Sequence, residues 1–265
     1  MNRRLASSFF ALMLWFAWLN LTGMGIAAAA EIKCMCAGAL KPGFAKVVPE
    51  FERSSGHRVT FVYDTVGALT DRIQKGEATD VAIVAGAQID SLQQQGKVIP
   101  GSRHNVAKVG IGAYVRKGTA KPDLSSIDSL RRTLLAAKSI AYADPAGGAA
   151  TGVYFASLLD RLDIAAEMKP KSSLYRDFAS DGPAYTDVAS GKVEMGFLPI
   201  SEIIAAGIVE YAGPLPPDAQ SYVLYAAGIA TSSKQPEPAN AFVDFVTSAS
   251  ARASLKSTGY EIPYQ

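Results

Sequence analysis

Three runs of small residues stand where the sequence predicts that helices begin. They are Gly38-Ala39, Thr65-Val66-Gly67, and Thr151-Gly152 at the end of a loop that contains Gly147-Gly148. The first amides of a helix have no partner within it and carry partial positive charge, and small residues let a ligand approach them. Each run is also compatible with an ordinary strand-to-helix connection or a flexible surface loop. The chemistry they indicate is anion binding by backbone amides.

The elements that would position these runs alternate between strands and helices. In the first half the expected strands are residues 31–35, 58–63, 80–84 and 106–116, and the expected helices are 40–51, 68–75 and 88–95. Pro42 suits the first turn of the first helix, and Gly56 fits just beyond its last turn. Strand and helix units in succession predict a mostly parallel sheet, in which ligands lie at the carboxyl ends of the strands.

The second half repeats this alternation. Its expected helices are residues 126–137, 153–162, 182–189, 238–247 and 250–257, and its expected strands are 139–143, 193–198, 208–211 and 221–231. Residues 213–217 contain three prolines and predict a stiff connector. The apolar segment 221–231 is long enough to pair with 106–116.

The first thirty residues have the pattern of a secretory signal peptide. Arg3 and Arg4 precede an apolar run, and Ala28-Ala29-Ala30 gives a cleavage pattern before Glu31. Removal of this segment leaves equal numbers of basic and acidic residues, because both of its charged residues are arginines. A neutral chain gives no reason to expect a nucleic-acid or anionic-membrane partner. We therefore expect a periplasmic protein.

Cysteine and histidine are too few and too scattered to indicate a metal site or a nucleophilic enzyme. Cys34 and Cys36 lie two residues apart in an expected strand, where a disulfide would close too short a ring, so we expect two buried thiols. His57 and His104 have neither ligand spacing nor a nucleophile motif around them. We expect no catalytic residue, no metal and no cofactor.

Several short segments, in a fixed order and spacing, carry a family resemblance. They are Ala37-Gly38-Ala39-Leu40 with Phe51, Ala68-Leu69 through Asp80-Val81, Asp144-Pro145 with Gly152-Val153-Tyr154, Gly196-Phe197, and Gly259-Tyr260. The chain thereby resembles the periplasmic molybdate-binding proteins of ABC importers. The resemblance implies an α/β periplasmic-binding-protein fold of type II, with two lobes joined by two crossover strands. It implies lobe I over residues 31–112 and 225–265, lobe II over 113–224, and a small oxyanion held between them by a monomer that docks on membrane permease subunits.

The ligand positions that the resemblance implies depart from the family pattern. The positions carried over are Gly38, Ala39, Thr65, Val66, Gly67, Thr151, Gly152, Asp181, Pro199 and Ser201. Ala39 stands where the family has a serine, Thr65-Val66-Gly67 replaces a serine-rich turn, and Pro199 replaces a tyrosine. Because these hydroxyl donors are missing, we expect molybdate to bind weakly or not at all and a larger anion to bind best, and a larger organic anion is an alternative to the small oxyanion. Service to a sensor instead of a transporter is an open alternative.

Overall fold

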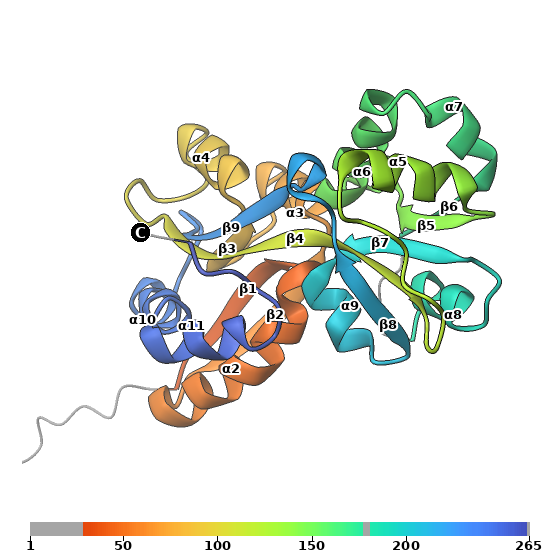
Figure 1. Cartoon of the computed structure of the whole chain (residues 1–265). Helices are drawn as coiled ribbons and strands as arrows, with labels where there is room; N and C mark the ends of the chain where they lie inside the picture. The colour runs from red at the N-terminus through yellow and green to blue at the C-terminus, as the bar shows by residue number, and fades with distance from the viewer. Residues whose placement is uncertain (1–28, 177–180, 264–265) are drawn as a thin grey trace, which may run out of the picture.

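The computed structural model describes residues 29–176 and 181–263, which form two α/β lobes side by side (Figure 1). The predicted fold class is confirmed. The first 28 residues, and with them most of the predicted signal peptide, lie outside the described residues. No helix in the described ranges is long and apolar enough to cross a membrane.

The first lobe has a sheet in the order β2-β1-β3-β9-β4. Its parallel strands are β1 (Glu31–Ala37), β2 (Arg58–Asp64) and β3 (Val81–Ala85). The helices are α2 (Lys41–Ser55), α3 (Val66–Gln74), α4 (Gly86–Gln94), α10 (Pro236–Val246) and α11 (Ala249–Lys256). Helices α2, α10 and α11 cover one face, and α3 and α4 the other (Figure 1). Helix α2 ends as predicted, because Gly56 takes the left-handed conformation that glycine allows at this position.

The second lobe repeats this plan with shorter strands. Strand β5 (Ile140–Ala143) lies parallel to β6 (Ser172–Tyr175) and β7 (Met195–Pro199), and β8 (Val209–Pro214) pairs with β4. The helices are α5 (Ile127–Ala136), α6 (Ala150–Arg161), α7 (Ala165–Met168), α8 (Pro183–Ala189) and α9 (Ile200–Ala206).

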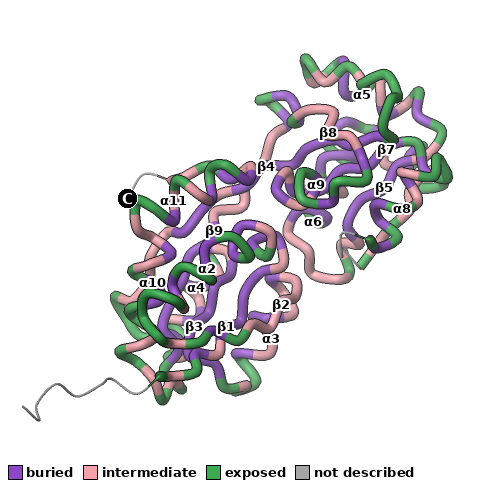
Figure 2. Tube along the Cα trace, turned by 90° about the horizontal axis from the view of Figure 1, so that it is seen from below, coloured by how far each residue is buried: buried purple, intermediate pink, exposed green. Residues whose placement is uncertain are grey.

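Two long strands connect the lobes. Strand β4 (His104–Arg116) pairs antiparallel with β9 (Tyr222–Ile229) in the first lobe and with β7 in the second. The expected pairing of these two segments is confirmed. Along β4, Val109 packs in the first lobe's core and Ile111 in the second's, and Figure 2 shows the two buried regions joined by these strands. This division supports the predicted lobe limits, which stay a prediction.

Several element limits differ from those expected. Helix α6 begins at Ala150 rather than Val153, and α3 begins at Val66 rather than Ala68. Thr and Gly are accepted in these first turns because the amides there need no partner within the helix. Strand β8 extends to Pro214 at the sheet edge, so the expected connector starts later. The short elements β6 and α7 were not predicted, because four residues carry too little periodicity.

Cys34 and Cys36 are free and fully buried in β1, as expected. Both lie in a strand of a sheet that is covered by helices on each face (Figure 1), and Figure 2 shows β1 as largely buried. Burial raises the pKa of the Cys36 thiol far above its ordinary value, so the thiolate that reacts with oxidants is disfavoured. These thiols act as small core residues.

Candidate functional site

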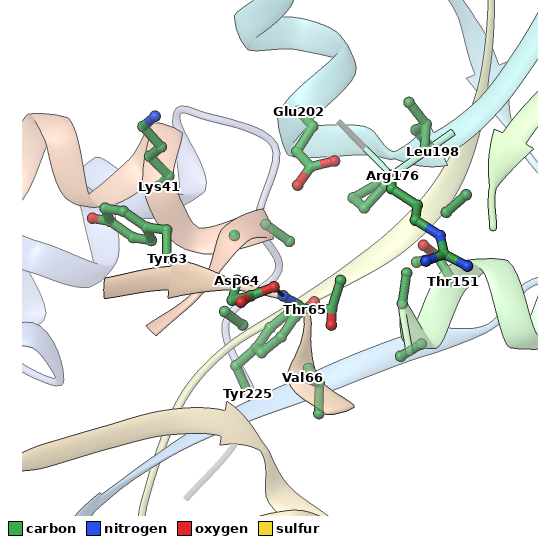
Figure 3. A pocket seen from close by; sticks show the side chains of 17 residues that line it. Lys41, Tyr63, Asp64, Thr65, Val66, Thr151, Arg176, Leu198, Glu202 and Tyr225 are labelled. Atoms are coloured by element: carbon green, nitrogen blue, oxygen red, sulfur yellow. Dashed lines mark hydrogen bonds between the residues drawn. The ribbon is translucent and has the colours of Figure 1, made fainter. Parts of the chain in front are cut away.

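A cavity of about 290 Å³ lies between the lobes, at the carboxyl ends of β1, β2, β5 and β7. Figure 3 shows its labelled side chains converging from both sides. Its lining comprises Ala37, Gly38, Ala39, Lys41, Tyr63, Asp64, Thr65, Val66 and Tyr225 on one side, and Ala143, Ala149, Ala150, Thr151, Arg176, Leu198, Pro199 and Glu202 on the other. The strand ends are therefore the site, as the parallel sheet predicts.

The first lobe contributes mainly backbone and small side chains. Gly38 and Ala39 form a 3₁₀ turn directly after β1, and Thr65 caps α3 by accepting a hydrogen bond from the Ala68 amide at 3.2 Å. The Thr65 hydroxyl also donates to the Gly147 carbonyl at 2.8 Å. This hydroxyl is therefore engaged with the opposite lobe rather than free for a ligand.

Two further contacts hold the lobes together beside the cavity. The Gly67 amide donates to the Gly148 carbonyl at 3.3 Å. On the other side the buried Ser201 hydroxyl donates to the Ala39 carbonyl at 3.0 Å. The structure thus has the lobes in contact on both sides of a cavity that stays partly open to solvent.

The second lobe contributes polar and charged side chains. Helix α6 begins at the cavity, and the buried Thr151 hydroxyl forms no hydrogen bond within the described part of the chain. The Arg176 side chain donates from Nε to Asp144 at 2.7 Å. The bond to Arg176, followed by one from the Ala146 amide, lowers the pKa of Asp144. Arg176 is thereby held at the cavity by a carboxylate that stays ionised.

Glu202 is a cavity-lining carboxyl group whose pKa is strongly raised. It lies in the first turn of α9, and its carboxyl group points into the cavity (Figure 3). Burial raises the pKa of Glu202 to about 8. Its side chain is therefore largely protonated at neutral pH, and no hydrogen bond or ion pair to it exists among residues 29–176 and 181–263.

Tyr225 lies on β9 at the base of the cavity and is only 3% exposed. Burial, and then the nearby Glu202, raise the pKa of Tyr225 well above the ordinary value, so its hydroxyl stays neutral. Within the described residues this hydroxyl has no hydrogen-bond partner. It is available to donate to a ligand.

Six of the ten predicted ligand positions line the cavity: Gly38, Ala39, Thr65, Val66, Thr151 and Pro199. Gly67, Gly152, Asp181 and Ser201 do not. Gly152 instead packs against β5, where an added Cβ would lie 2.2 Å from the Ala143 carbonyl oxygen. Asp181 is exposed, and Pro199 has no amide hydrogen to donate.

Four further side chains that line the cavity were not predicted from the sequence: Lys41, Arg176, Glu202 and Tyr225. The sequence indicated anion binding by backbone amides, and Lys41 and Arg176 add two basic side chains to them. The sequence did contain a signal for Glu202. This acidic residue follows the apolar strand β7 by three positions, and ligands bind at the carboxyl ends of such strands. No local signal marks Tyr225 within its apolar strand.

Comparison with known proteins identifies the family. The family model described as bacterial extracellular solute-binding protein matches residues 32–261. The chain therefore belongs to the bacterial extracellular solute-binding proteins, which agrees with the expected export.

Two curated relatives differ in what their names say. One, 28% identical over 87% of this chain and 88% of its own length, is an aconitate isomerase from a Pseudomonas species. Another, 26% identical over 88% of this chain and 91% of its own, is the molybdate-binding protein ModA of Azotobacter vinelandii. The expected resemblance to molybdate-binding proteins is confirmed, while the prediction that the chain is not an enzyme stays a prediction.

The fold agrees with a solved structure of this class. The periplasmic molybdate-binding protein of Azotobacter vinelandii superposes with a TM-score of 0.73 at 22% identity, covering 88% of this chain and all of that one. This likeness confirms the type II fold, and it leaves the ligand open.

Proposed function

We propose that the chain binds a small organic anion with more than one carboxylate between its lobes and delivers it to the permease subunits of an ABC importer. This proposal is carried by the polar side chains with which the second lobe lines the cavity. Arg176, Thr151 and a protonated Glu202 face one cavity. Arginine pairs with a carboxylate through two parallel hydrogen bonds, and a neutral carboxyl donates one more.

A single tetrahedral oxyanion fits this cavity poorly. Ala39 and Pro199 supply no hydroxyl, and the Thr65 hydroxyl is engaged with Gly147. Each missing hydrogen bond to a charged ligand costs about 1.5–3 kcal/mol. The volume of about 290 Å³ also approaches the range of roughly 300–1,000 Å³ that is usual for small organic ligands.

A ligand screen tests this proposal. The purified chain is heated with citrate, aconitate, tricarballylate, succinate, sulfate or molybdate, because a ligand at about 100 times its Kd adds roughly 2.7 kcal/mol to stability. We expect polycarboxylates to raise Tm most and calorimetry to give micromolar or tighter affinity. A rise with molybdate alone would contradict the proposal.

The location and assembly state are part of the same proposal. We propose a periplasmic monomer whose chain is cleaved before Glu31. Support comes from the Ala28–Ala30 pattern and the extracellular family. Intact mass of the exported protein and light scattering test both points, and a retained Met1 or a stable dimer counts against them.

A second candidate function is isomerisation of an unsaturated polycarboxylate. Two observations favour it: a relative that matches 87% of this chain is named aconitate isomerase, and Glu202 titrates near neutral pH inside the cavity. Groups with pKa values close to the working pH are suited to move protons. Proton NMR of cis- or trans-aconitate incubated with the purified chain tests whether one isomer becomes the other.

A further inference from the structure

We propose that Glu202 is the acid–base residue of this cavity, moving a proton between two carbon atoms of a bound unsaturated polycarboxylate, with Tyr225 as the neutral donor to a ligand carboxylate. This inference rests on the second function proposed above. Nothing in the comparisons assigns a role to either residue.

Glu202 differs from the other acidic side chains at the cavity in having no partner within the described ranges. Asp64 accepts a hydrogen bond from the Thr65 amide at 2.7 Å and lies 3.7 Å from Arg72. Asp144, beside the cavity, pairs with Arg176. Figure 3 shows the Glu202 carboxyl group pointing into the space between Arg176 and Tyr63. It is therefore the carboxyl group positioned to meet a ligand.

The surroundings of Glu202 make it a stronger base than an ordinary carboxylate. Neutral tyrosines surround it, and three charged side chains line the same cavity. These groups are Tyr114 on β4, Tyr185 on α8, Tyr225 on β9 and Tyr260, together with Lys41, Asp64 and Arg176. Elements packed against α9 also carry Glu210 and Tyr211 on β8. Burial, not a charged neighbour, raises the pKa of Glu202 to about 8.

Tyr225 and Arg176 complete the arrangement. The Tyr225 hydroxyl is buried, faces the cavity and has no partner in the described part of the chain. It donates to the carboxylate that receives negative charge when the ligand loses a proton. Arg176 lies at the other side of Glu202 and binds a second carboxylate (Figure 3). Donors placed where charge develops stabilise the transition state more than the bound ligand.

The reaction step balances without any added reagent. The ionised Glu202 takes a proton from the methylene carbon next to the double bond. The electron pair of that C–H bond forms a new double bond, and the electron pair of the former double bond accepts the proton back from Glu202. The double bond has then moved by one carbon, and Glu202 is ionised again. No oxidant or reductant takes part.

The test compares the wild-type chain with Glu202→Gln, using trans-aconitate as the probe. Calorimetry measures binding, and proton NMR follows the appearance of the other isomer. We expect Glu202→Gln to keep binding and to lose about 10²–10⁴-fold in rate, the usual contribution of a general acid–base group. In the wild type the rate should rise with pH up to about 8, as Glu202 ionises.

Controls separate this role from a structural one. Glu167→Gln makes the same change on an exposed side chain of α7 and should leave the rate and its pH profile unchanged. Tyr225→Phe removes only the hydroxyl and should lower kcat about tenfold or more while its circular dichroism matches the wild type. A Glu202→Gln chain that fails to fold is replaced by Glu202→Asp, which keeps the carboxyl and should shift the pH profile.

Each outcome distinguishes the inference from the functions on which it rests. Isomerisation that persists in Glu202→Gln overturns the role of Glu202 and leaves the isomerase function intact. Binding without isomerisation overturns the inference and the isomerase function, and leaves the transport proposal intact. Absence of trans-aconitate binding overturns the inference and the isomerase function, whereas the transport proposal falls only if citrate, tricarballylate and succinate fail to bind as well.

Discussion

The two sides of the cavity are built differently. The first lobe presents Gly38, Ala39 and a Thr65 hydroxyl that is already bonded, whereas the second presents Thr151, Arg176 and Glu202. Backbone and small residues hold an anion without selecting its shape, while the second lobe's side chains have direction and charge. On the proposed function, ligand choice would therefore depend mainly on the second lobe, with Tyr225 added from the connecting strand.

The largest effect expected concerns the buried carboxyl of the second lobe. The pKa of Glu202 is about 8 in the folded chain against 4.5 ordinarily, so the folded state holds one more proton between these values. The free energy of unfolding should therefore fall as pH rises through this window, by at most about 5 kcal/mol.

Urea unfolding at pH 5 and pH 9 measures this decline. Glu202→Gln should abolish most of it, whereas Asp64→Asn, which removes the first lobe's cavity carboxyl, should not. Equal curves for Glu202→Gln and the wild type would show that Glu202 is ionised in both states.

Two of the three glycines taken from the family pattern, Gly67 and Gly152, give the next largest contrast. Gly152→Ala places a methyl group 2.2 Å from the Ala143 carbonyl oxygen and should destabilise the second lobe by about 3 kcal/mol. Gly67→Ala meets the Gly148 Cα at 3.2 Å and should cost under about 1 kcal/mol. Chemical denaturation measures the free energy of unfolding of both variants. Equal decreases would mean that the backbone of β5 shifts at Ala143 with little cost.

The cationic side chains of the two lobes, Arg176 and Lys41, are expected to differ in how much they contribute to ligand affinity. Arg176→Ala should weaken binding of citrate or aconitate about 10- to 100-fold, because a charge-assisted hydrogen bond contributes roughly 1.5–3 kcal/mol. Lys41→Ala, in the first lobe, should change affinity only a few-fold, since Lys41 pairs with no carboxylate among the described residues, whereas Asp144 holds Arg176 at the cavity. Titration calorimetry at constant salt measures both. A larger loss for Lys41 would move selectivity to the first lobe.

The smallest effect tests the contact between the lobes. Ser201→Ala removes one donor from the Ala39 carbonyl, but the Tyr260 hydroxyl still donates to it, so we expect a loss of about 1 kcal/mol. Thr151→Val removes a hydroxyl that has no partner among the described residues and should leave stability unchanged while weakening ligand binding. A stability loss for Thr151→Val would indicate that its hydroxyl has a structural role.

Sequence patterns alone determined most of the architecture. Apolar periodicity, Pro42 and Gly56 located α2, and the length of segment 221–231 predicted its pairing with β4, because these signals are local or depend on strand length. The small-residue runs also led to the correct end of the sheet, since parallel strands bring their carboxyl ends together.

Only the tertiary structure decided which side chains meet. Arg176 reaches the cavity by pairing with Asp144, 32 residues earlier. Ser201 and Gly152, which the family pattern assigns to the ligand, are occupied by the opposite lobe and by β5. Glu202 reads in sequence as an ordinary helix-start residue, and its raised pKa arises from desolvation by elements distant in the chain. Burial and the pairing of charges depend on packing between elements that are distant in the sequence, which no local pattern encodes.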